Sequence, residues 1–176
     1  IRNHGDVNDS NVGHTTLSGT AEIRDCHAKC ANDYIYTSYG GGVSDAGTLT
    51  ISGDVTIIGC TDGGQGSDAM YINANNGSSV TGGTFYGSVK DVGNKITDPI
   101  VTYQVNDANY ATQVVPSGET ATQPADPTVP AGQTFDGWYK ADGTEWNFTN
   151  DTVTESLTLT GWLYVGVDTE QAFTNA

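Results

Sequence analysis

The sequence predicts an all-β protein, and three observations support this class. The 176 residues include 23 glycines and are rich in Thr, Ser, Asn and Asp, a composition that favours short strands and turns over helices. No window keeps an apolar period of 3.6 residues, whereas alternation of apolar and polar residues recurs along the chain. One short phrase is also repeated in the first half. A chain of this length forms one large domain or two small ones.

The repeated phrase indicates the architecture of the first half. Residues 17–23 (LSGTAEI) align with residues 51–57 (ISGDVTI), and Cys26 aligns with Cys60 at the same offset, 60 − 26 = 34. A weaker copy (VTGGTFY) spans residues 80–86. Short strands that recur with glycine corners are typical of a β-solenoid, in which each coil buries its apolar face on the next coil. We therefore expect a solenoid over residues 1–97; a β-sandwich with similar strands is the alternative.

In a solenoid, equivalent side chains of successive coils stack about 4.8 Å apart. The expected interior ladders are Leu17 with Ile51 and Val80, and Ile23 with Ile57 and Tyr86. Corner conformations closed to other residues are expected at Gly19, Gly53 and Gly82. The phrase GGGVSDAGTLTISGDVTI resembles the repeats of bacterial surface proteins built as right-handed parallel β-helices, and this resemblance spans about residues 15–96.

The cysteines and histidines form no recognisable metal or nucleophile motif. An odd number of cysteines argues against a complete disulfide framework, although one bridge with one free thiol stays open as an alternative. The cysteine spacing fits no zinc site, and no histidine belongs to a nucleophile motif. We expect buried thiols and surface histidines, with Cys26 and Cys60 as interior neighbours. The residues concerned are Cys26, Cys30, Cys60, His4, His14 and His27.

One loop is a candidate calcium site. Residues 62–68 are rich in Asp and Gly, and Asp62 and Asp68 are the candidate ligands because calcium prefers carboxylate and carbonyl oxygens. The loop lacks the ligand order of an EF-hand, so an unliganded loop is favoured and no cofactor is expected.

The charge of the chain excludes two classes of partner. The chain contains six Lys and Arg and 21 Asp and Glu, which gives a formal net charge of −15. Such a surface repels phosphate backbones and anionic membranes, so we expect no nucleic acid partner. No apolar run approaches the roughly 20 residues of a membrane span, so no membrane insertion is expected. The sequence has no initiator Met or signal peptide, and we expect a mature or excised fragment that continues into other modules.

A second module is expected to begin near Asp98-Pro99. The residue before a proline is pushed towards extended conformations, and prolines mark module borders. Strands are expected at 100–105, 110–116, 134–139 and 157–165, joined by an extended proline-rich segment at 124–130. A turn at 141–144 and one helical turn between 149 and 156 are expected as further connections.

The second module contains the densest aromatic phrase of the chain, TFDGWY at residues 134–139. Its aromatic side chains each bury on the order of 150–250 Å² when they pack in a core. Trp138, Tyr139 and Trp146 are candidates for a sugar-stacking platform. In a domain of this size a core role is favoured over a platform.

Three phrases of the second half (VTYQV, PADPTVPAGQTFDGWY and WNFTNDTVTESLTLTGW) resemble the Listeria–Bacteroides repeat, the internalin B-repeat family of bacterial surface proteins. The resemblance covers residues 100–165 and implies a compact β-grasp-like module at 98–166, in series on secreted or wall-attached proteins. Residues 167–176 are expected to form a tail or an edge strand. The alanine-lysine-tryptophan phrase that commonly closes the family is replaced here by Thr160-Gly161-Trp162.

These observations predict a non-catalytic segment of a bacterial cell-surface or secreted protein, located outside the cell. We expect a spacer or adhesin module whose partner is a host-surface protein or a glycan. The alternatives are a carbohydrate-binding module and a fragment of a polysaccharide-acting β-helix enzyme. Three coils make a short groove for an extended sugar chain, and the carboxylates are dispersed through turns, so no enzymatic activity is expected. Exposure of Trp138 and Trp146 distinguishes a sugar binder from a spacer, because a spacer buries them.

Overall fold

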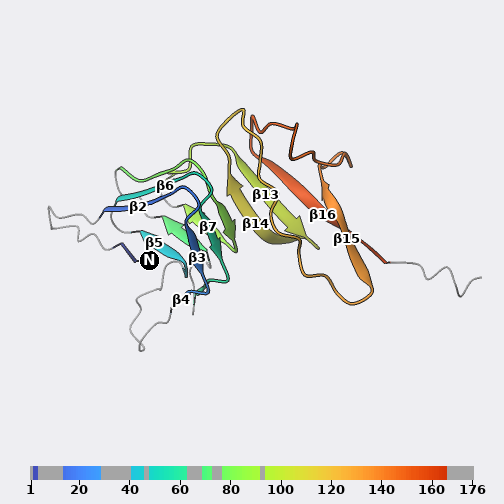
Figure 1. The fold of residues 1–176 in the computed structure, drawn as a ribbon, viewed down its shortest axis with the longest axis horizontal. Helices are drawn as coiled ribbons and strands as arrows, with labels where there is room; N and C mark the ends of the chain where they lie inside the picture. Colours follow the sequence, from blue (N-terminus) through green and yellow to red (C-terminus); the bar gives the residue numbers. More distant parts are fainter. Residues whose placement is uncertain are drawn as a thin grey trace, which may run out of the picture.

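The structure, a computed structural model, describes residues 2–3, 14–28, 41–45, 48–62, 69–72, 77–91 and 94–165. Within these ranges the regular secondary structure consists of strands without a helix, so the predicted all-β class is confirmed. Figure 1 shows the short strands of the first half at one end of the molecule and the longer strands of the second half at the other.

The short strands of the first half form parallel sheets. One sheet has the order β10 (Ser79–Val80), β6 (Thr48–Ser52), β2 (His14–Ser18), and another has the order β1 (Arg2–Asn3), β5 (Val43–Asp45), β9 (Met70–Ile72), β12 (Val89–Asp91). Strands β3 (Glu22–Arg24), β7 (Thr56–Ile58) and β11 (Thr84–Tyr86) also lie side by side, and β4 (His27–Ala28) pairs with β8 (Thr61–Asp62). All of these pairs are parallel, so equivalent strands of successive repeats are neighbours.

The first expected ladder is confirmed. Leu17 pairs with Ile51, and Ile51 pairs with Val80. An isolated parallel bridge from Val80 to Ile96 extends this ladder by one further residue. Ile51 and Val80 are fully buried, whereas Leu17 is half-buried.

The second expected ladder is wrong in its third member. Ile23 pairs with Ile57 as predicted, but Ile57 pairs with Phe85 and not with Tyr86. The corner before Phe85 is one residue shorter than the corner before Ile57, so the alignment of the third copy slips by one position. Successive side chains in a strand point to opposite faces. Phe85 is therefore buried in the hydrophobic core of the first half, while Tyr86 packs against the hydrophobic core of the second half.

The three glycine corners are confirmed at two positions and corrected at the third. Gly19 and Gly53 have φ angles of 68° and 77°, conformations that favour glycine. Gly82 has no positive φ; Gly83 takes that role with a φ of 108°. At Gly82 the requirement is space, since a Cβ there would lie 2.6 Å from the carbonyl oxygen of Gly53.

Cys60 and Cys26 are neighbours in the first half, as predicted. Both are free thiols, and the amide of Thr61 donates to the carbonyl of Cys26 at 2.8 Å. Cys60 is buried, and burial raises the pKa of its thiol. Cys26 is only half-buried and packs against the edge of the same core, so the burial expected for both thiols is wrong for Cys26. Cys30 lies outside the described residues.

The second half contains four longer strands close to the expected positions. They are β13 (Ile100–Val105), β14 (Ala108–Val114), β15 (Gln133–Tyr139) and β16 (Leu157–Val165). Strand β13 pairs antiparallel with β14 and parallel with β16, while β15 pairs antiparallel with β16. The helical turn expected between 149 and 156 is wrong. The carbonyl of Asn147 instead accepts hydrogen bonds from the amides of Asn150 and Asp151 and forms a tight turn.

A single sheet joins the two halves. Strand β11 of the first half pairs antiparallel with β14 of the second, with Phe85 opposite Thr112. The resulting seven-stranded sheet has the order β15-β16-β13-β14-β11-β7-β3 (Figure 1). Strand β14 pairs with the edge that β11 leaves open beside β7, so backbone pairing links the segments on either side of the border expected at Asp98-Pro99.

The Gly53–Gly82 approach gives a test of the stacking. We expect Gly82→Ala to lower the free energy of unfolding by about 3 kcal/mol, because the added Cβ overlaps the backbone of Gly53. Gly19→Ala is the control, since Gly19 has a positive φ but open space around it, and this change costs about 1 kcal/mol. Equilibrium urea unfolding measures both values. Equal losses for the two variants would contradict the close approach of the strands.

Candidate functional site

The aromatic phrase of β15 builds the core of the second half. The Trp138 ring lies 4.9 Å from the Tyr103 ring and 5.2 Å from the Phe135 ring, both in edge-to-face geometry. Trp138 is 1% exposed and Trp146 is 6% exposed. The predicted platform of Trp138, Tyr139 and Trp146 is therefore wrong for the two tryptophans, because both side chains are almost fully buried. The favoured core role of these two residues is confirmed.

Tyr139 lies on the opposite side of the strand from Trp138. Its ring stacks on the ring of Trp162 with a centroid distance of 4.2 Å and an interplanar angle of 16°. Trp162 is 47% exposed. Trp162 was not predicted as a site residue, although the alternation of β16 carries the signal. Leu159 and Gly161 are buried, whereas Trp162, which follows Gly161, points outward.

A surface pocket of about 480 Å³ opens beside the aromatic core. Four aromatic residues line it, namely Phe135, Trp138, Trp146 and Phe148. Its ionisable lining groups are all carboxylates, from Asp126, Asp136 and Glu145. The indole N–H groups of both tryptophans are buried without a hydrogen-bond acceptor among the described residues. The carboxylates of this pocket suit a small group that is cationic or rich in hydrogen-bond donors, whereas the two indole N–H groups need an acceptor.

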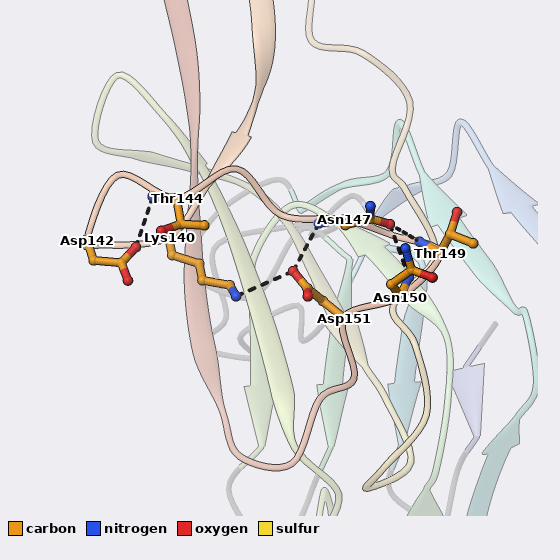
Figure 2. Close-up of polar contacts among 7 residues, drawn as sticks. All are labelled: Lys140, Asp142, Thr144, Asn147, Thr149, Asn150 and Asp151. Atoms are coloured by element: carbon orange, nitrogen blue, oxygen red, sulfur yellow. Dashed lines mark hydrogen bonds and ion pairs between the residues drawn. The ribbon is translucent and has the colours of Figure 1, made fainter.

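Polar contacts hold the loop that carries Glu145 and Trp146 (Figure 2). The Asp151 carboxylate accepts from the amide of Asn147 at 3.0 Å and lies 3.4 Å from the Lys140 ammonium. The backbone hydrogen bond and then the lysine lower the pKa of Asp151. The amide of Thr144 donates to Asp142 at 2.9 Å, and this bond lowers the pKa of Asp142.

The side chain of Asn147 makes the tight turn in the same loop. Its carbonyl oxygen accepts from the amides of Thr149 and Asn150 at 2.9 and 3.1 Å (Figure 2). An asparagine side chain that binds the backbone two residues ahead mimics a backbone turn. The Lys140 ammonium also lies 5.0 Å from the centre of the Trp146 ring. This loop is a structural support for the pocket wall.

The other candidate residues contribute no described site. Asp68 and the side chain of Asp62 lie outside the described residues, so calcium binding there stays a prediction. His4 and the side chain of His27 also lie outside them, while His14 is exposed at the start of β2. No group of three or more His, Cys, Asp or Glu side chains in the described ranges is arranged to hold a metal ion. The same ranges contain no helix long and apolar enough to cross a membrane.

A comparison with known proteins gives a match in the second half. Residues 100–160 match the family model described as the Listeria-Bacteroides repeat domain, which confirms the resemblance seen in the sequence. This family is a repeat module of bacterial surface proteins. No curated protein matches the chain.

The hydrogen bond between Tyr139 and Asp136 has a measurable consequence. The Tyr139 hydroxyl donates to the Asp136 carboxylate at 2.6 Å, and this bond raises the pKa of Tyr139 to about 12. In the unfolded chain the phenol titrates near its ordinary value of 10.0. Between these two pH values the unfolded state loses the proton and the folded state keeps it. The contribution of Tyr139 to stability is therefore full below pH 10 and disappears as the pH rises to about 12.

We expect Asp136→Ala to move the titration of Tyr139 down towards its ordinary range. The phenolate absorbance of the folded protein, followed against pH, measures this shift as a difference from the parent protein. Glu119→Ala removes an exposed carboxylate that makes no contact with Tyr139 and should leave the curve unchanged. An unaltered curve for Asp136→Ala would show that the hydrogen bond does not control this pKa.

Proposed function

We propose that the chain is a rigid, non-catalytic connector within a bacterial surface protein, located outside the cell. The first half acts as the end of a right-handed parallel β-solenoid, and the second half acts as a β-grasp-like repeat module fused to it. The observation that carries this proposal is the pairing of β11 with β14, which makes one sheet of the two halves. A connector transmits position and force between the modules on either side, and a continuous sheet suits that role.

A buried glutamine supports the junction. Gln113 is 5% exposed, and its amide nitrogen donates to the hydroxyl of Thr84 in the first half at 2.8 Å. Its carbonyl oxygen accepts from the amide of Thr122 at 3.0 Å and from the hydroxyl of Tyr103 at 3.3 Å. One buried side chain thus has partners in both halves. Removing it leaves buried polar groups without partners, which costs more than the bond contributes.

A second set of contacts ties the proline-rich segment to the first half. The hydroxyl of Tyr86 accepts from the amide of Ala125 at 2.8 Å, and the hydroxyl of Tyr110 donates to the carbonyl of Ala125 at 2.8 Å. The two tyrosine rings meet edge to face at 5.4 Å. Val114 of the second half is buried in the hydrophobic core of the first half. Backbone, polar and apolar contacts all cross the junction, which supports a fixed orientation.

The surface location is supported by the family of the second half, which is typical of bacterial surface or extracellular proteins. An adhesin role towards a host-surface protein or a glycan is the finer form of this proposal. Burial of Trp138 and Trp146 weighs against a carbohydrate-binding module that uses these residues. No histidine lines the pocket, and its carboxylates face no basic group in it, which weighs against the polysaccharide-acting alternative.

Nuclear relaxation of backbone ¹⁵N tests the rigid connector. We expect the amides of β7 and β16 to report one common rotational correlation time, because both strands belong to one sheet. Two distinct correlation times would show that the halves tumble separately and would contradict the proposal.

The same proposal makes Gln113 a structural residue of the junction. Gln113→Ala should lower the free energy of unfolding by about 1–3 kcal/mol, whereas Gln104→Ala, a half-buried control in β13, should change it by less than about 0.5 kcal/mol. Similar losses for both variants would remove the support that Gln113 gives to the proposal.

A further inference from the structure

The outer face of the β15–β16 pair carries an exposed aromatic stack beside carboxylates, and the described structure leaves it uncovered. We call this surface the Trp162 face and define it by Asp136, Tyr139, Glu145 and Trp162. Trp162 remains 47% exposed although the Tyr139 ring covers one side of it. Tyr164, two residues further along the same side of β16, is 50% exposed. Strand β15 is the outermost strand of the seven-stranded sheet, so the face lies at the end of the molecule (Figure 1).

Two carboxylates lie next to the ring stack. Asp136 accepts the hydrogen bond of Tyr139. Gly137 pairs with Trp162 across the strands, and the Oε1 atom of Glu145 lies 3.1 Å from the position that a Cβ of Gly137 would take. Glu145 also forms a backbone bridge with Tyr139. The indole and both carboxylates therefore belong to one surface.

No basic side chain neutralises these carboxylates in the described structure. Residues 100–165 contain one Lys or Arg, which is Lys140, and eight Asp or Glu, so their formal charge is 1 − 8 = −7. Lys140 is already placed between Asp151, at 3.4 Å, and the ring of Trp146, at 5.0 Å. The described ion pairs include neither Asp136 nor Glu145.

The arrangement around Lys140 shows what the Trp162 face lacks. At Lys140 an ammonium group lies over an indole ring and beside a carboxylate, so the cation is attracted by both the ring and the charge. The Trp162 face has the indole and two carboxylates, with no cation. We propose that this face docks a basic segment of a partner protein, with an Arg or Lys side chain over Trp162 and paired with Asp136 and Glu145.

Charge complementarity selects this occupant over the others. A neutral glycan can stack on Trp162 but leaves the carboxylates without a counter-charge. Nucleic acids and acidic glycans are repelled by the charge of −7. The inference rests on the proposed role as an exposed surface module, but it concerns only the Trp162 face. Failure to bind would leave the common tumbling of the two halves untouched, so the two proposals fail separately.

Binding of a fluorescein-labelled hexa-arginine peptide to the full chain, followed by fluorescence anisotropy, tests the proposal. We expect Trp162→Leu and the double variant Asp136→Asn/Glu145→Gln each to weaken binding about five-fold, because each removes part of the cation site. Trp162→Phe keeps an aromatic ring and should lose less than Trp162→Leu. Hexaglutamate should not bind, and higher salt should weaken the hexa-arginine complex.

The matched control is Glu119→Gln/Glu155→Gln, which also removes two exposed negative charges: Glu155 precedes the start of β16, and the Glu119 carbonyl accepts from the amide of Val153 nearby. It should keep the parent affinity within about two-fold. Equal weakening by the control would show attraction by net charge alone and would overturn the proposal.

Two further outcomes identify a different occupant. Binding of cellohexaose or chitohexaose that is lost in Trp162→Leu, without hexa-arginine binding, would overturn the proposal in favour of a glycan. Self-association in sedimentation that is lost in Trp162→Leu would overturn it in favour of a second copy of the chain. Thermal unfolding of each variant shows that it is folded, and the double carboxylate variant tests the site while keeping both aromatic rings of the stack.

Discussion

Strand β14 covers the open edge of β11, and this pairing joins the strands of both halves in one sheet. A stack of parallel strands ends in a row of unpaired N–H and C=O groups, which must be paired or covered to prevent association with other chains. The structure pairs that edge of the first half with an antiparallel strand of the second, so Thr84 and Phe85 have strand partners on both sides and Tyr86 pairs with Ala111. The same contact turns the four strands of the second half into part of a larger sheet. Neither half is a self-contained unit at this border.

The aromatic residues of the second half divide between core and surface because neighbouring residues of a strand face opposite ways. Trp138 packs with Tyr103 and Phe135 and holds the inner side of the sheet, whereas the next residue, Tyr139, stacks on exposed Trp162. The phrase at residues 134–139 therefore contributes Trp138 to the core of the module and Tyr139 to its candidate docking surface. A rigid sheet beneath the surface keeps Trp162 and the neighbouring carboxylates in place, which lowers the entropic cost of binding.

The features that repeat in the sequence or follow a local pattern were predictable, and the long-range strand pairing was not. The Leu17, Ile51 and Val80 ladder follows from the alignment of the repeats, whereas one shorter corner was enough to exchange Tyr86 for Phe85. The β11–β14 pairing joins segments of unrelated sequence, and such long-range strand pairing has no periodic signal. The second-half strands and the core role of Trp138 followed from local pattern and size. The exposure of Trp162 was not predicted because it depends on which face of β16 covers the core, and that face is set by the pairing of β16 with β13 and β15.

The central claim is that the two halves form one cooperative unit through β11 and β14. Native-state hydrogen exchange in increasing urea tests it most directly, because it reports the free energy of opening at each amide. We predict that the amides of β7 in the first half and of β13 in the second converge on the same opening free energy and the same dependence on urea. If the first half instead opens at a lower free energy while β13 stays protected, the shared sheet does not couple the two halves and the account is wrong.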